Sequence, residues 1–110
     1  MRSQMKLAYR LISEFRQGLL PAGSTVTDDQ SRLIRLLSED LAVNSDRVDL
    51  EQLIQLVSKA DSYWNKRTMA AIDRFYAFRE AGDPAEAEKE RQAFIGECPS
   101  VWYCGILSSL

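Results

Sequence analysis

Residues 77–86 have the sequence Ala-Phe-Arg-Glu-Ala-Gly-Asp-Pro-Ala-Glu, which joins the end of one predicted helix to the start of the next. Gly82 suits the left-handed position that ends many helices. Asp83 can cap a new helix, Pro84 fits its first position, and Glu86 can reach back from three residues after the cap. The stretch therefore predicts a helical hairpin with a turn at residues 82 and 83.

Apolar residues recur every three or four positions on both sides of this turn, as they do on the buried face of a helix. In the helix before the turn, the predicted inner face comprises Trp64, Thr68, Ala71, Ile72, Phe75 and Phe78. The helix after the turn runs to about Gly96, and its predicted inner face comprises Ala87, Arg91, Phe94 and Ile95. Pro99 prevents this helix from continuing.

Two further helices are predicted at the N-terminal end of the chain. The first covers residues 2 to about 17, and Gly18 and the Pro-Ala-Gly-Ser cluster at 21–24 form a loop after it. Thr27 or Asp28 can cap the second helix, because both side chains can accept a hydrogen bond from the backbone of the first turn.

The helix that follows is predicted to begin at Asp46 or Asp49. We expect it to break or kink near residues 58–63, where the pattern becomes polar and the Asp61-Ser62 pair can cap a new helix. A continuous helix from Asp46 or Asp49 to Ala81 would have more than about 30 residues, which is long for a globular domain.

Strand signals are weak throughout the chain, since only residues 101–107 are rich in β-prone side chains. The chain has 110 residues, enough for one hydrophobic core. The sequence therefore predicts an all-α fold, a compact bundle of about five helices. We expect residues 1–110 to form a single helical domain, with the C-terminal apolar segment packed on it.

The composition narrows the possible functions. The net charge is −2 and the chain contains no histidine, the commonest general base and a frequent zinc ligand. It also has no glycine-rich phosphate loop, and the acidic balance disfavours nucleic acid as a partner. We expect no catalytic activity, no cofactor and no metal. No segment is apolar enough for a signal peptide or a membrane span, so the expected location is the cytoplasm, away from membranes.

Both cysteines lie in the C-terminal segment, ECPSVWYCGILSSL at 97–110. Cys98 and Cys104 could form a redox pair. Glu97 and the C-terminal end of the preceding helix both disfavour a thiolate at Cys98, so burial as small apolar side chains is the preferred interpretation. We expect Trp102 and Ile106 to fold the segment onto the bundle. If it is not folded back, an apolar patch for a homodimer would comprise Trp102, Tyr103, Ile106 and Leu107.

The middle of the chain is acidic. Residues 28–61 carry eight acidic and four basic side chains, and the candidate partner-binding residues in this segment are Glu39, Asp40, Asp46, Asp49 and Glu51, with Arg47 among them. The spacing lacks the oxygen ligands and central glycine of a calcium loop. Two interpretations remain: a solvated helix–loop–helix face, or a docking surface for a basic protein.

A basic segment follows, with Lys66, Arg67, Arg74 and Arg79 interleaved with Tyr63, Trp64 and Tyr76. Such a pattern can bind single-stranded nucleic acid. The alternative is that the aromatic residues belong to the core and that the bases pair with acids of the following helix, namely Glu86, Glu88 and Glu90. We expect the second arrangement.

Three resemblances bear on function. The stretch Ala77–Asp83, followed by Ala85, Ala87 and the pair Ala93-Phe94, resembles the hairpin of a tetratricopeptide repeat in a single copy. Residues 10–97, which have this hairpin after an acidic helical first half, are similar to DUSAM-type helical domains of bacteria. In size, acidity and helicity the chain also resembles small bacterial immunity proteins of contact-dependent growth inhibition. The last resemblance implies neutralisation of a toxin, most concretely a basic nuclease, by occlusion of its active site; the DUSAM likeness implies a structural or regulatory interaction domain.

Overall fold

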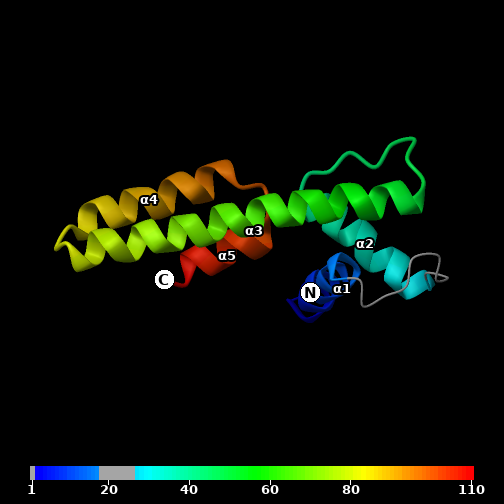
Figure 1. The fold of residues 1–110 in the computed structure, drawn as a ribbon, viewed down its shortest axis with the longest axis horizontal. Helices are drawn as coiled ribbons and strands as arrows, with labels where there is room; N and C mark the ends of the chain where they lie inside the picture. Colours follow the sequence, from blue (N-terminus) through cyan, green and yellow to red (C-terminus); the bar gives the residue numbers. More distant parts are fainter. Residues whose placement is uncertain (1, 18–26) are drawn as a thin grey trace. The chain divides into compact units, whose positions relative to one another are not determined.

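The computed structural model describes residues 2–17 and 27–110, and within them the chain is entirely helical between its turns (Figure 1). The helices are α1 (Arg2–Arg16), α2 (Asp28–Asp40), α3 (Leu50–Glu80), α4 (Pro84–Glu97) and α5 (Val101–Ser108). The described residues contain no strand, which confirms the all-α prediction. The predicted loop at residue 18 and at 21–24 lies outside them.

The chain divides into two compact units, Met1–Asp61 and Ser62–Leu110. Helix α3 contributes its first part to one unit and its second part to the other. The single-domain organisation stays a prediction.

Of the break or kink expected in the middle of α3, the break is wrong, because this helix runs through all 31 residues from Leu50 to Glu80. Asp61, which could have capped a new helix, is buried with 3% exposure. Its Oδ2 atom accepts a hydrogen bond from Arg16 Nη1 at 2.6 Å. The carboxylate therefore bonds a side chain of α1, and the helix continues past it. The described helices still number five, because α5 forms where only an apolar segment was expected.

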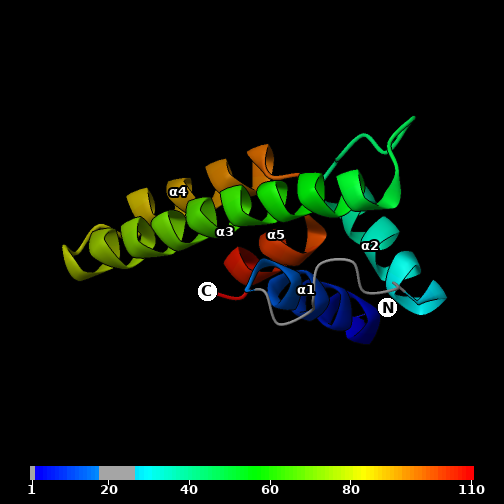
Figure 2. The ribbon, with the colours of Figure 1, turned by 45° about the vertical axis from the view of Figure 1, so that its right-hand side comes forward.

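Within the first unit, α1 packs against α2 (Figures 1 and 2), and Arg16 at its end forms an ion pair with Asp61 of α3. Its core takes apolar side chains from all three helices and from the end of α2: Ala8, Leu11, Ile12, Ile34, Leu37, Leu41, Leu53 and Val57. Helix α2 begins at a capping box, in which Thr27 Oγ1 accepts from Gln30 N and Gln30 Oε1 accepts from Thr27 N. Of the two predicted caps, Thr27 is the one used.

The hairpin of the second unit forms at the predicted turn. Gly82 has φ of +79°, and the Gly82 and Asp83 amides donate to the carbonyls of Arg79 and Phe78, which is a Schellman motif. Asp83 then caps α4 by accepting from the Glu86 amide at 3.2 Å. The Glu86 carboxylate bonds Lys89, since the Asp83 amide that it was expected to reach already donates to Phe78.

The C-terminal segment packs on the bundle as a helix. The Ser100 hydroxyl is buried and accepts from the Tyr103 amide at 3.1 Å, which fixes the start of α5. Tyr103 and Leu107 are the buried anchors of α5, at 5% and 0% exposure. Trp102 and Ile106, the expected anchors, are only half-buried. Because Tyr103 and Leu107 are in the core, the apolar patch suggested for a homodimer loses two of its four residues.

Candidate interaction surface

The acidic residues predicted to bind a partner lie at the connection between α2 and α3, which we call the α2–α3 loop (residues 41–49). The loop begins where α2 ends in a left-handed turn at Ala42, with φ of 56°. The Ala42 amide donates to Glu39 O at 3.3 Å, and the Val43 amide donates to Ser38 O at 2.8 Å. This is the Schellman arrangement again, with alanine at the position where glycine is usual.

The far end of the loop is held by a second set of hydrogen bonds. Asp49 Oδ1 accepts from the Gln52 amide at 2.8 Å, and Gln52 Oε1 accepts from the Asp49 amide at 3.3 Å, so the pair forms a reciprocal cap at the start of α3. Between the two ends, Asn44 Oδ1 accepts from the Asp46 amide at 2.9 Å. The backbone of the loop is therefore tied at both ends and in the middle.

The candidate acidic residues separate into two groups. Glu39, Asp46, Asp49 and Glu51 are exposed on the loop or beside it. Asp40 is buried, with 7% exposure, and its Oδ2 atom accepts from the Tyr9 hydroxyl at 2.6 Å. Asp40 therefore does not belong to the exposed surface, because its carboxylate joins α1 to α2. We call Glu39, Asp46, Asp49 and Glu51 the acidic surface.

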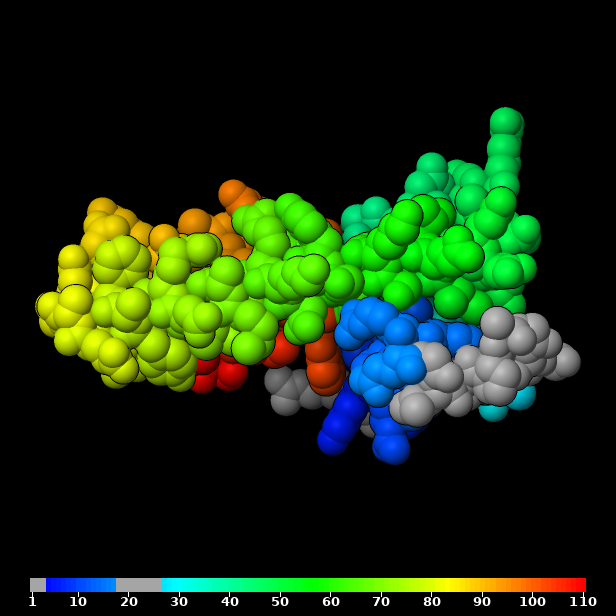
Figure 3. All heavy atoms as spheres, in the orientation of Figure 1, coloured from blue at the N-terminus to red at the C-terminus, as the bar shows by residue number. Residues whose placement is uncertain are grey.

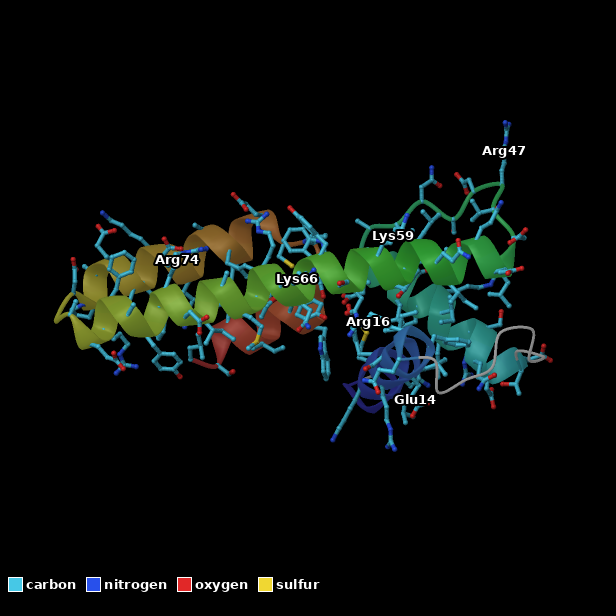
Figure 4. All side chains as sticks on the ribbon, in the orientation of Figure 1. Glu14, Arg16, Arg47, Lys59, Lys66 and Arg74 are labelled. Carbon is cyan, nitrogen blue, oxygen red and sulfur yellow. The ribbon has the colours of Figure 1, made fainter. Side chains whose placement is uncertain are left out.

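Arg47 is the residue of this region whose conformation the sequence did not indicate. It is exposed, and its backbone has φ of 61°, a value that costs a residue with a Cβ atom roughly 1–2 kcal/mol. Its side chain points outward from the loop, away from the helices (Figure 4). The space-filling view shows the same part of the chain standing out from the first unit (Figure 3). The acidic surface thus has an arginine at its most prominent point.

The basic segment of α3 has a different arrangement. Arg67 donates to Glu97 and to the Tyr63 hydroxyl, and its guanidinium lies over the Trp64 ring, 5.2 Å from the centroid. The hydrogen bond to Glu97, followed by the one to Tyr63, raises the pKa of Arg67. Trp64 in turn packs edge-on against Phe94 at 6.1 Å.

Farther along α3, Arg74 Nε pairs with Glu90 at 3.0 Å, and Arg79 lies over the Phe75 ring. The expected pairing between the hairpin helices is confirmed for Glu90. Glu86 and Glu88 bond Lys89 and Arg91 within α4. Three of the four basic side chains are thus engaged inside the second unit, which supports the expected role of the bases. The expectation that the aromatic residues belong to the core is wrong for Tyr63 and Tyr76, which are 52% and 45% exposed, because both side chains lie on the outer face of α3.

The sequence analysis did not predict Glu97 as the partner of Arg67, but the register of the hairpin could have identified it. Arg67 and Arg74 are seven residues apart, and so are Glu90 and Glu97 on the antiparallel helix. An ion pair between Arg74 and Glu90 therefore places Glu97 beside Arg67, since both helices advance by two turns.

The described residues contain no cluster of side chains suited to hold a metal ion. Within the same residues, no helix is both long and apolar enough to cross a membrane. No protein-family model, curated protein or solved structure matches the chain.

Proposed function

We propose that the chain is a protein-binding module whose acidic surface docks on a basic face of a partner protein. In its most concrete form the partner is a bacterial toxin with a basic active site, such as a nuclease, and the chain acts as its immunity protein. Carboxylates would then occupy positions that substrate phosphates take in the toxin.

The observation that carries this proposal is the exposure of four carboxylates around a loop whose backbone is already fixed. A loop that is ordered before binding loses less conformational entropy when a partner arrives. Glu39 lies at the end of α2, Asp46 lies in the α2–α3 loop, and Glu51 lies in the first turn of α3. The charges therefore come from two helix ends and from the loop that joins them. Exposed acidic groups also steer a basic partner into contact and raise the association rate.

Arg47 adds a second feature that favours recognition. Backbone strain of the kind seen at this residue is often found at functional sites, where the surrounding structure maintains it. Arginine is also among the residues that contribute most to protein interfaces. A cation in the middle of the acidic surface would select a partner that presents a carbonyl or carboxylate within its own basic face.

The test has two stages. The full chain, tagged at one end, is used to capture partners from lysate of the native cell at physiological salt, and the captured proteins are identified. The most abundant basic partner is then expressed under a tight promoter, with and without the chain. We expect its expression to stop growth and co-expression of the chain to restore it.

Two outcomes of this test distinguish the immunity function from the more general function of docking on a basic protein. A basic partner that is not toxic would exclude the immunity function and leave an interaction module of the DUSAM kind. If the captured partners are acidic or neutral, or if none is captured above the level of an unrelated helical bait, the docking function itself is wrong.

A further inference from the structure

The two cysteines of the chain meet at the junction between α4 and α5. Cys98 is the C-terminal cap of α4, with φ of −78° and ψ of 126°. Cys104 lies in α5 and turns its side chain back toward that cap. Its Sγ atom is 3.4 Å from Cys98 O and 3.7 Å from Ile95 O. The Cys104 thiol is therefore packed against the backbone of the other cysteine.

Covalent geometry sets an upper limit on the distance between the Cys104 sulfur and the Cα atom of Cys98. A carbonyl oxygen lies about 2.4 Å from the Cα atom of its own residue, so Cys104 Sγ is within about 6 Å of Cys98 Cα. A disulfide needs Cα atoms roughly 4.4–6.8 Å apart and Cβ atoms roughly 3.5–4.5 Å apart. The Cys104 sulfur thus lies beside the residue that carries the other thiol, and a disulfide requires the two side chains to rotate until these Cα and Cβ separations are met. Both residues belong to the same compact unit.

The two thiols differ in access. Cys98 is buried with 7% exposure, whereas Cys104 is half-buried. A small oxidant in solution therefore reaches Cys104 first. This difference gives each cysteine a separate role, because the sulfenic acid formed at the accessible sulfur can condense with a second thiol close by.

We propose that Cys98 and Cys104 form a reversible intramolecular disulfide when the protein meets a peroxide. The Cys104 thiol gives up the proton that it shares with the backbone carbonyls, and its sulfur attacks one peroxide oxygen. The O–O bond breaks, the departing oxygen takes that proton and leaves as water or an alcohol, and Cys104 becomes a sulfenic acid. The Cys98 sulfur then attacks the Cys104 sulfur, the S–O bond breaks, and the hydroxyl group leaves as water with the proton of Cys98. The two cysteines together lose two electrons, and the peroxide gains them.

The disulfide acts as a lock on α5. Helix α5 is held to the unit by its buried anchors and by its packing on α4. A disulfide between the C-terminal cap of α4 and the middle of α5 limits how far the two helices can separate. It also restricts the conformations of the unfolded chain. In the reduced protein α5 separates more easily from α4. The oxidised form should thus unfold at a higher temperature than the reduced form.

The experiment uses the full wild-type chain, folded and reduced, treated with a small excess of hydrogen peroxide. We expect the intact mass to fall by about 2 Da, the mass of the two hydrogen atoms lost. A peptide linking Cys98 to Cys104 should appear after digestion without reductant. Dithiothreitol should restore the original mass, and the melting temperature should rise on oxidation and return on reduction.

Two variants provide the controls. Cys98→Ser should keep the reactive Cys104 but lack the resolving thiol, so a dimedone adduct of sulfenic acid should accumulate at Cys104. Cys104→Ser should react much more slowly, because the remaining thiol is buried. The proposal is overturned if the wild-type protein gains oxygen without forming the linked peptide, or if it forms only disulfides between molecules. It is also overturned if oxidation leaves the melting temperature unchanged.

Discussion

Arg16 and Asp61 are 45 residues apart in the sequence, and their side chains form an ion pair with 2.6 Å between Nη1 and Oδ2. The two partners differ in exposure, at 34% for the Arg16 side chain and 4% for that of Asp61. The pair ties the last turn of α1 to α3 within the first unit. It also accounts for the continuity of α3, since it gives a buried carboxylate in the middle of a helix a charged partner.

Removal of the arginine should therefore destabilise the protein strongly. Arg16→Ala takes a cationic donor from a buried carboxylate, and we expect a loss of about 2–3 kcal/mol in the free energy of unfolding. Chemical denaturation followed by circular dichroism measures this loss. Arg10→Ala is the matched control, because Arg10 pairs with Glu14 on the same helix with its side chain 77% exposed, and its loss should cost less than about 0.5 kcal/mol. Equal effects of the two substitutions would contradict the account of Asp61.

A glycine at the end of α2 should stabilise the protein. Ala42 has φ of 56°, so Ala42→Gly relieves a left-handed backbone at a residue with a Cβ atom and should add about 1 kcal/mol. The same substitution at Ala93, exposed in the interior of α4, should instead cost about 1 kcal/mol. Urea denaturation of the two variants measures both changes. A loss of stability in Ala42→Gly would show that this turn is not left-handed.

The ion pair between Glu88 and Arg91 should make a small contribution to stability that depends on pH. The hydrogen bond from Arg91, and then that from Gln92, lowers the pKa of Glu88 below its usual 4.5. The unfolded state therefore binds the proton first as the pH falls, and the contribution is complete above about 4.5 and lost as the pH falls through the lower pKa of the folded protein. Glu88→Gln should be less stable than wild type at about pH 7, and the difference should narrow below about pH 4. A difference that stays constant over this range would exclude the pair as its cause.

The sequence predicted best where the chain's local chemistry and its tertiary contacts agree. The turn at Gly82 and Asp83 needs only neighbouring residues, and it formed as expected. Asp61 was misinterpreted because an aspartate is a helix cap by local rules, whereas here it has a partner 45 residues away. Asp40 was included among the candidate partner-binding residues for the same reason, since its bond to Tyr9 is a contact between two helices. The strained backbone of Arg47 has no sequence signal, because arginine rarely occurs in that conformation.

The structure also shows which acidic residues can be reversed in charge without damage to the fold. Asp49 caps α3, so its substitution would remove a hydrogen bond as well as a charge. Glu39 is at the C-terminal end of α2, where a lysine is more favourable than a glutamate, and Asp46 is exposed in the loop. Glu39→Lys with Asp46→Lys is therefore the suitable pair. Its control is Asp73→Lys with Glu80→Lys, two exposed acids of α3 outside the acidic surface, one of them also at a helix end.

The most direct test of the docking surface is the dissociation constant of each double variant with the captured basic partner, measured by calorimetry at physiological salt. Both variants carry the same net charge, so any difference between them reports the position of the charges and not their sum. We predict that reversal at Glu39 and Asp46 weakens binding by about tenfold or more, about 1.4 kcal/mol, and that reversal at Asp73 and Glu80 changes it much less. Equal dissociation constants for the two variants would contradict the assignment of the α2–α3 loop as the binding surface.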